Sequence, residues 1–255
     1  MKTKSGVRSL LLLTTLAILA ATAQPAAAQV VRQAAGPTAA DIQPAVDAYR
    51  ADLGPLNANV PGSFGSGRRE INWDGVPDAF AAPNQLPPDF FNGSGPPRSR
   101  GVVFATPGSG FEVSANQGVA PVEFGDINPT YPTLFAPFSP QRLFTALGSN
   151  VTEVRFFIPG SATPATSAGF GAVFSDVDRA GTKIEYFARG GSKLGEFAVP
   201  PTAGNETFSF LGVSFAHRVV RTVKITSGTS ALGHSETLAR DLAVMDDFIF
   251  GEPVP

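Results

Sequence analysis

The chain has 255 residues, no cysteine, 16% charged residues and a formal net charge of −2. The lack of cysteine excludes disulfides, thiolate metal sites and a cysteine nucleophile, and the acidic balance disfavours nucleic acid and anionic membrane surfaces as partners. A hydrophobic core must stabilise the fold, and 21 phenylalanines can supply it because each buries a large side chain without needing a hydrogen-bond partner.

Residues 1–28 have the three parts of a secretory signal peptide. Three basic residues, Lys2, Lys4 and Arg8, precede a short uncharged apolar stretch, and Ala26-Ala27-Ala28 supplies the small residues before a cleavage position. The apolar stretch is shorter than the ~20 residues that span a bilayer, so a membrane anchor is the weaker alternative. We expect a secreted, extracytoplasmic protein with a formal charge of about −5 and no membrane association after cleavage.

Residues 29–64 are predicted to form an N-terminal segment with one helix, over about 38–53, and residues 29–36 are expected to be flexible. Thr38 can cap the helix with Asp41 at the capping-box position, and Gly54 can end it in the left-handed conformation. The apolar positions that share one helical face are Ile42, Val46, Tyr49 and Leu53. We expect this face to pack against a sheet.

From residue 65 onward the pattern changes to the two-residue period of strands. Residues 69–74 alternate, with Ile71 and Trp73 on one face and polar side chains on the other. Because no helices alternate with the strands, we predict an all-β domain over 65–255, a two-sheet antiparallel β-sandwich of the jelly-roll type. The other predicted strands are 101–106, 110–115, 121–125, 151–158, 168–176, 183–189, 193–199, 206–215, 218–226 and 242–251.

The usual catalytic signatures are missing from the sequence. There is no Gly-x-Ser-x-Gly nucleophile motif, no phosphate-binding loop and no His-Glu-x-x-His, and the two histidines, His217 and His234, are far apart along the chain. We therefore expect no catalytic residues. Carboxylates are available on several predicted strands, so a secreted polysaccharide hydrolase stays open as the second interpretation.

The segment Asp176-Val177-Asp178-Arg179-Ala180-Gly181 has the opening pattern of an EF-hand calcium loop. Position twelve of such a loop needs a bidentate glutamate, but here it is Phe187, and no flanking helices are predicted. An EF-hand is therefore rejected. Two aspartates before a glycine are more often part of a β-turn, so we interpret the segment as a turn, with a metal loop as the alternative.

Two acidic groups stand at opposite ends of the predicted β region. Glu70, Asn72 and Asp74 lie on the opening strand, and Asp246 and Asp247 lie in the apolar closing strand. Neighbouring residues in a strand point to opposite faces, so one aspartate is expected to face inward or to sit at an edge. An unpaired buried carboxylate is costly, and a cation between the two strands would remove that cost. These five residues are our candidate calcium ligands, with arginine pairing or simple exposure as the alternative.

Several short motifs carry a resemblance to known exported proteins. The opening and closing strands resemble those of the β-sandwich carbohydrate-binding modules of secreted bacterial enzymes. The middle of the chain is similar to exported modules of the PEP-CTERM type, although its C-terminus departs from their sorting segment, and the whole chain resembles a family of bacterial exported proteins of uncharacterised function. The resemblance implies a jelly-roll fold and a structural calcium. The motifs are 67–75, 139–144, 169–174, 208–213 and 245–253.

Carbohydrate-binding modules hold sugars against exposed aromatic rings, because the apolar face of a sugar stacks on a flat ring. Trp73 is the single tryptophan and its strand position favours the core, whereas Tyr131, between Pro129 and Pro132, is the best-placed exposed aromatic. Trp73 and Tyr131 are the ligand-binding candidates. The first interpretation is a secreted, non-catalytic protein that binds an extracellular ligand such as a glycan. A structural or matrix protein is the third, and the oligomeric state stays open.

Overall fold

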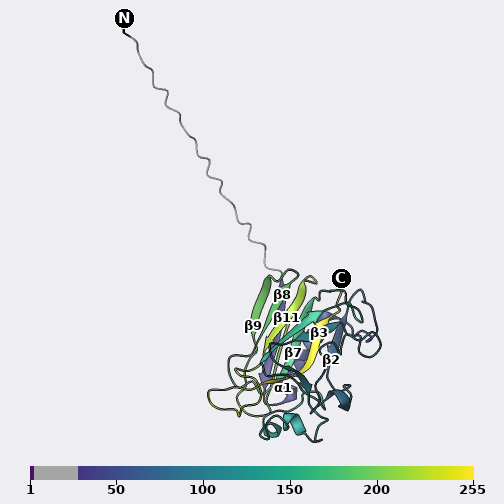
Figure 1. The fold of residues 1–255 in the computed structure, drawn as a ribbon, viewed down its shortest axis with the longest axis vertical. Coiled ribbons are helices and arrows are strands. Elements are labelled where there is room, and N and C mark those ends of the chain that lie inside the picture. Colours follow the sequence, from purple (N-terminus) through teal and green to yellow (C-terminus); the bar gives the residue numbers. More distant parts are fainter. Residues whose placement is uncertain (3–27) are drawn as a thin grey trace.

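The computed structural model describes residues 1–2 and 28–255, so the predicted signal peptide lies almost entirely outside the described residues. The described chain forms two antiparallel sheets that pack face to face, with one α-helix against the larger sheet (Figure 1). This architecture confirms the predicted all-β sandwich with one N-terminal helix.

The strand order places the first and last predicted strands next to each other. The larger sheet has the order β1 (Gln29–Gly36), β10 (Phe208–Phe215), β7 (Gly169–Ser175), β12 (Val244–Gly251), β5 (Phe144–Leu147) and β4 (Gly110–Val113), and β2 (Arg68–Ile71) also pairs with β12. The smaller sheet has the order β3 (Val102–Ala105), β6 (Val151–Phe156), β11 (Val220–Thr226), β8 (Lys183–Ala188) and β9 (Lys193–Ala198). Short 3-10 helices lie at Asp78–Phe80, Val122–Phe124 and Tyr131–Thr133.

Two local predictions are wrong. Residues 29–36 are not flexible, because they pair along their whole length with β10 and form an edge strand. Residues 121–125 do not form a strand: Glu123 and Phe124 have φ values of 44° and 66°, which are incompatible with extended backbone. Both segments are short, so contacts with neighbouring segments determine their backbone conformation more than the local pattern of side chains does.

The single described α-helix, α1 (Ala39–Leu53), begins at the predicted cap and ends before Gly54. The backbone N–H of Thr38 and its hydroxyl donate to Asp41 Oδ2 at 2.9 and 2.6 Å. Gly54 has a positive φ of 92° but a ψ of −163°, so the predicted left-handed conformation is wrong. The predicted apolar face is buried against the larger sheet. The apolar face of α1 covers β7, β10 and β12. Arg50, next to Tyr49 of this face, therefore lies on the outer side of the larger sheet and contacts Glu70 of β2 and Asp247 of β12.

Tyr49 fixes the position of α1 on the sheet. A Cβ atom at Gly212 would lie 2.7 Å from the Tyr49 ring, and one at Gly171 would lie 2.8 Å from it. Glycines of two adjacent strands therefore leave the space that the ring fills, and the Tyr49 hydroxyl donates to the Val213 carbonyl at 3.1 Å. A side chain at either glycine would push the helix away from the sheet.

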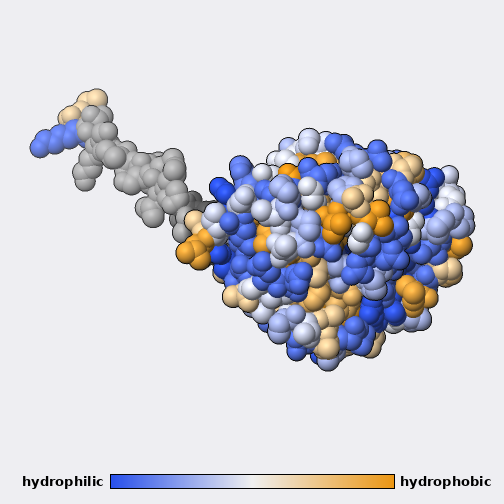
Figure 2. Space-filling model, turned by 90° about the horizontal axis from the view of Figure 1, so that it is seen from below, coloured by the Kyte–Doolittle hydropathy of each residue, from blue (hydrophilic) through white to orange (hydrophobic). Residues whose placement is uncertain are grey.

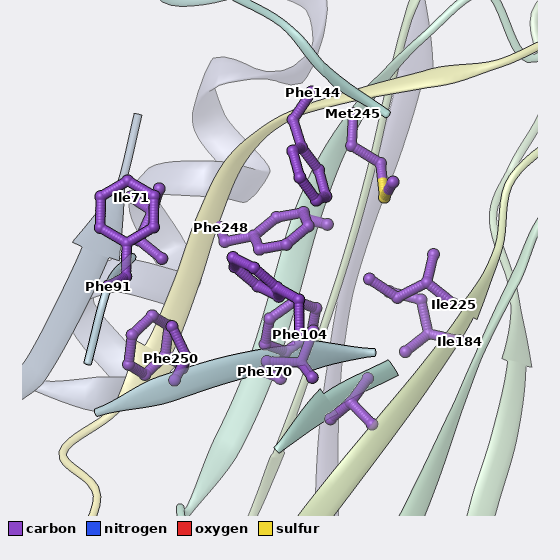
Figure 3. Packing of buried hydrophobic residues seen from close by; sticks show 14 of the residues in the cluster. Ile71, Phe91, Phe104, Phe144, Phe170, Ile184, Ile225, Met245, Phe248 and Phe250 are labelled. Atoms are coloured by element: carbon purple, nitrogen blue, oxygen red, sulfur yellow. The ribbon is translucent and has the colours of Figure 1, made fainter. Parts of the chain in front are cut away.

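The inner faces of both sheets form one aromatic core. Figure 3 shows Phe104, Phe144 and Phe248 together at its centre, with Ile184 and Ile225 of the smaller sheet beside them. Trp73 joins this group: its ring stacks on Phe144 with centroids 4.0 Å apart. The predicted supply of a core by phenylalanine is thus confirmed, and it stabilises the sandwich without disulfides.

The outer surface is mostly hydrophilic, with hydrophobic patches interspersed on the face seen in Figure 2. Among the described residues, no helix is both long enough and apolar enough to cross a membrane. The large apolar side chains that are exposed in the described part of the chain are Met1, Val30, Val31, Leu56, Phe64, Val119 and Leu238.

Candidate functional site

The opening and closing strands pair directly, so the two acidic groups that the sequence singled out lie together. Glu70 of β2 stands opposite Ile249 of β12 in the antiparallel register. A β-bulge between Met245 and Phe248 contains both Asp246 and Asp247. The sandwich therefore brings carboxylates from two distant parts of the sequence to one place on the outer side of the larger sheet.

The β-bulge gives the two aspartate side chains an orientation that differs from the predicted one. Ser139 Oγ lies 3.2 Å from Asp246 Oδ1 and 2.8 Å from Asp247 Oδ1, so both carboxylates reach the same neighbour. Regular alternation would have sent them to opposite faces, but the extra residue of a bulge interrupts it. Both aspartates are buried, with 0% and 3% exposure.

Arg50 of α1 lies between Glu70 and Asp247. Its Nη2 donates to Glu70 Oε2 at 3.0 Å and to Asp247 Oδ2 at 3.1 Å, and its Nε donates to Glu70 Oε1 at 3.1 Å. Arg68 also donates to Glu70 Oε1, at 2.6 Å. Burial raises the pKa of Asp247 to about 6, although the hydrogen bond from Ser139 and the charge of Arg50 act in the opposite direction.

Asp246 and Asp74 hold the segment that precedes β5. The backbone N–H groups of Phe138 and Ser139 donate to Asp246 Oδ2 at 2.6 and 3.1 Å. Burial raises the pKa of Asp246 well above its usual range, and the charge of Asp247 adds to this rise. The amides of residues 141 and 142 donate to Asp74 Oδ1 at 2.5 and 3.2 Å, and Asn72 Nδ2 donates to Asp74 Oδ2 at 3.0 Å.

Every carboxylate oxygen of the five predicted calcium ligands therefore lies within hydrogen-bond distance of a donor in the described structure. For both oxygens of Glu70 and for Asp247 Oδ2 that donor is an arginine, the alternative arrangement that the sequence left open. A cation at this place would have to displace the Arg50 guanidinium and the loop amides. The oxygens present do not call for a metal ion to neutralise or orient them.

A pocket of about 300 Å³ opens beside these residues. Seven of its eight lining residues have polar, hydrogen-bonding side chains, and the other is Leu56. Asn59 Oδ1 is buried and has no hydrogen-bond partner among the described residues. Arg100 donates to the Glu70 carbonyl at 2.9 Å and lies over the Phe91 ring, and burial lowers its pKa to about 10. The lining residues are Arg50, Leu56, Asn59, Glu70, Asn72, Arg100, Ser139 and Asp247.

The two predicted ligand-contact aromatics lie inside the protein. Trp73 is 0% exposed, and its Nε1 donates to the Asp246 carbonyl at 2.9 Å. The expectation that Tyr131 is exposed is wrong: it is also 0% exposed, packs 5.2 Å from Phe135 and donates through its hydroxyl to the His234 carbonyl. The flanking prolines of Tyr131 place it in a 3-10 turn that folds inward. Neither ring has a face available for stacking.

A second acidic cluster was not predicted as a unit. One carboxylate oxygen from each of Asp178, Glu236 and Asp241 lies within 4.8 Å of the other two. The segment at 176–181 was interpreted as a turn, and no spacing in the sequence connects it with residues 236 and 241. The only sign of this cluster in the sequence was the pair of aspartates before a glycine, because Glu236 and Asp241 approach Asp178 only in the folded protein.

The fold and the site together define an all-β sandwich with a small polar pocket at the junction of its helix and its terminal strands. A scan against protein-family models, a search of curated proteins and a search of solved structures each found no match.

A buried carboxyl on β4 gives a pH-dependent prediction. Glu112 is 4% exposed, its Oε1 has no hydrogen-bond partner among the described residues, and burial together with the charge of Asp126 raises its pKa to about 8. Between about pH 4.5 and pH 8 the unfolded chain loses this proton while the folded protein keeps it, so the free energy of unfolding falls as pH rises.

Replacing Glu112 by glutamine is therefore expected to stabilise the protein by about 1–3 kcal/mol at pH 8 and to change little at pH 4.5. Urea unfolding of both proteins across this pH range would measure the difference. Glu153→Gln, at the surface of β6 beside Arg155, is the matched control and should show no such pH trend. A gain at pH 8 no larger than the gain at pH 4.5 would contradict the raised pKa of Glu112.

Proposed function

We propose that the protein is a non-catalytic β-sandwich binding protein that works outside the cytoplasm and takes a hydroxyl-rich ligand, such as an extracellular glycan, in the pocket between α1, β2 and β12. The observation that carries this proposal is the polar lining of the pocket, in which seven of eight residues can form hydrogen bonds. The export signal expected at residues 1–28 supports the location.

The chemistry of the pocket suits sugar hydroxyls, because each hydroxyl both donates and accepts a hydrogen bond. Arg50 and Arg100 supply donors, while Glu70 and Asp247 supply acceptors. The ion pairs of Arg50 hold these groups in place before a ligand arrives. Such preorganisation lowers the entropic cost of binding.

The small volume of the pocket and the lack of aromatic lining residues restrict the kind of ligand that it can bind. A volume of about 300 Å³ is at the lower end of small-molecule sites, so the pocket fits a terminal sugar better than a long chain. The tryptophan and all three tyrosines are fully buried, and the partly exposed Phe64 is not among the lining residues. Recognition through hydrogen bonds and charge is therefore proposed in place of ring stacking.

A hydrolase is the second candidate, because two carboxylates lie at a suitable separation. Glu70 Oε2 and Asp247 Oδ2 both lie close to Arg50 Nη2, so they are no more than about 6 Å apart, within the range used by glycosidases. However, the guanidinium between them occupies the space that a reacting sugar carbon would need. Both carboxylates are thus engaged in ion pairs, and binding without hydrolysis is the better supported function.

A glycan-array screen followed by calorimetric titration of the best glycan tests this proposal. Asn59→Ala and Asn72→Ala are each expected to weaken binding about tenfold, since each removes a polar group from the pocket wall. Asn116→Ala, in the wall of a different pocket, is the matched control and should bind normally. Failure to bind any glycan, or equal effects of all three substitutions, would overturn the proposal. Release of reducing sugar that is lost in Asp247→Asn would favour the hydrolase.

A further inference from the structure

Three acidic side chains meet, with a fourth buried nearby, where the end of β7 approaches the segment before β12. Asp176 and Asp178 follow β7 directly, and Glu236 and Asp241 lie in the long connection between β11 and β12. We propose that Asp178, Glu236 and Asp241 bind a divalent cation with oxygen ligands, calcium first of all, beside the buried carboxyl of Asp176. This site is distinct from the calcium site that the sequence suggested at Glu70 and its neighbours, and it does not depend on glycan binding.

Two buried carboxylates with unpartnered oxygens, Asp241 within the cluster and Asp176 beside it, are the observation that points to a ligand. Asp176 is 0% exposed, and among the described residues neither of its oxygens has a hydrogen-bond partner. Asp241 is also 0% exposed, and its Oδ2 likewise has no partner in the described part of the chain. A buried carboxylate without partners costs several kcal/mol or stays protonated. The contrast with Asp246, whose oxygens accept hydrogen bonds from two amides and a hydroxyl, is direct.

Backbone amides orient the other carboxylates through one oxygen each. Gly204 N–H donates to Asp178 Oδ1 at 2.7 Å, Asp178 N–H donates to Asp241 Oδ1 at 2.9 Å, and Leu242 N–H donates to Glu236 Oε1 at 3.2 Å. The second oxygen of each group is left for a cation. Such bonds to one oxygen are the usual way in which the surrounding protein positions a metal ligand.

The separations fit calcium. One oxygen each from Asp178, Glu236 and Asp241 lie within 4.8 Å of one another, and two ligands of one calcium ion, each at 2.3–2.6 Å, can be at most about 5 Å apart. All the ligands are carboxylates, which favours a hard cation over zinc or copper.

The local charge also favours a cation. Arg179 is the basic residue whose charge acts on both Glu236 and Asp241, but its guanidinium donates to the carbonyls of residues 237 and 238. Against the four carboxylates of Asp176, Asp178, Glu236 and Asp241, one arginine leaves three in excess. The charges of Glu236, Asp178, Asp241 and Glu206 all act on Asp176, so this end of the sandwich concentrates negative charge that a cation would offset.

Thermal unfolding of the purified protein in EDTA and in calcium chloride, at equal ionic strength, tests the site. Calcium at about a hundred times its Kd is expected to raise the Tm by roughly 5–10 °C, because it binds only the folded state. Titration calorimetry should show one site per chain. No shift in Tm together with no binding heat would overturn the proposal.

Single substitutions at the acidic residues test where the calcium ion binds. Asp178→Asn is expected to weaken calcium binding at least tenfold. Asp241→Asn should abolish the calcium-induced rise in Tm. Asp176→Asn, which removes a buried carboxyl without partners beside the site, should be at least as stable as the wild type in EDTA. Asp89→Asn, at an exposed loop position, is the matched control and should keep the full rise. A rise that survives in Asp178→Asn and Asp241→Asn, or one that disappears in Glu70→Gln instead, would overturn the assignment to these residues.

Discussion

Replacement of Arg69 by methionine is expected to destabilise the protein by about 3–5 kcal/mol, because it leaves Glu252 buried without a charged partner. Both side chains are 0% exposed, and Arg69 Nε and Nη2 donate to the two oxygens of Glu252 at 2.8 and 2.9 Å. Arg69 also donates to the carbonyls of Val60 and Gly62. The pair therefore holds the loop after α1 against the end of β12.

Chemical denaturation at pH 7 would measure this loss, provided that the dependence on denaturant stays unchanged. Arg155→Met, which removes the exposed pair with Glu153, is the matched control and should cost less than about 1 kcal/mol. The double variant Arg69→Met with Glu252→Leu should recover part of the stability, because no unpaired charge remains buried. Equal losses in Arg69→Met and Arg155→Met would contradict the role of the buried pair.

Replacement of Trp73 by alanine is expected to cost about 3–5 kcal/mol, the usual range for deletion of a buried large aromatic. The ring stacks on Phe144 and meets Phe91 and Phe248 edge to face at 5.6 and 5.1 Å, so its removal leaves a cavity in the centre of the core. Trp73→Phe should cost less, about 1–2 kcal/mol, since it keeps an aromatic ring but loses the hydrogen bond to the Asp246 carbonyl.

Circular dichroism is the suitable signal, because Trp73 is the only tryptophan and its fluorescence disappears with it. Leu56→Ala, at a position 57% exposed, is the control for removal of an apolar side chain and should change stability by less than about 0.5 kcal/mol. If Trp73→Phe left stability unchanged and abolished glycan binding, Trp73 would belong to a ligand site and not to the core.

The strands were predictable where side chains alternate over several residues. The segment that became β6 shows this pattern clearly, and most of β11 follows it, because a half-buried strand places every second residue in the core. The edge strand β1 was missed, since its side chains are largely exposed and carry no such alternation. Its formation depends on the unpaired edge that β10 offers, which is a property of the assembled sheet.

The same distinction applies to the aromatic residues. Trp73 was favoured for the core from its position in a predicted alternating strand. The strand ends at Ile71 and Trp73 has a φ of 65°, yet its side chain is buried in the core as expected. Tyr131, in a proline-rich segment without periodicity, was expected at the surface but packs under the connection before β12. A loop has no local pattern that distinguishes its buried side from its exposed side, so only the packing of distant segments determines it.

By itself, the sequence determined the all-β class, the single helix and the adjacency of the acidic residues at the two ends of the β region, because burial patterns extend over neighbouring residues. The tertiary structure decided what lies between those acids. Arg50 enters from α1 and pairs with Glu70 and Asp247. At the other cluster, both oxygens of Asp176 and Oδ2 of Asp241 are left without partners among the described residues. Whether a charge is neutralised depends on its distance in space from an opposite charge. The sequence alone does not give that distance.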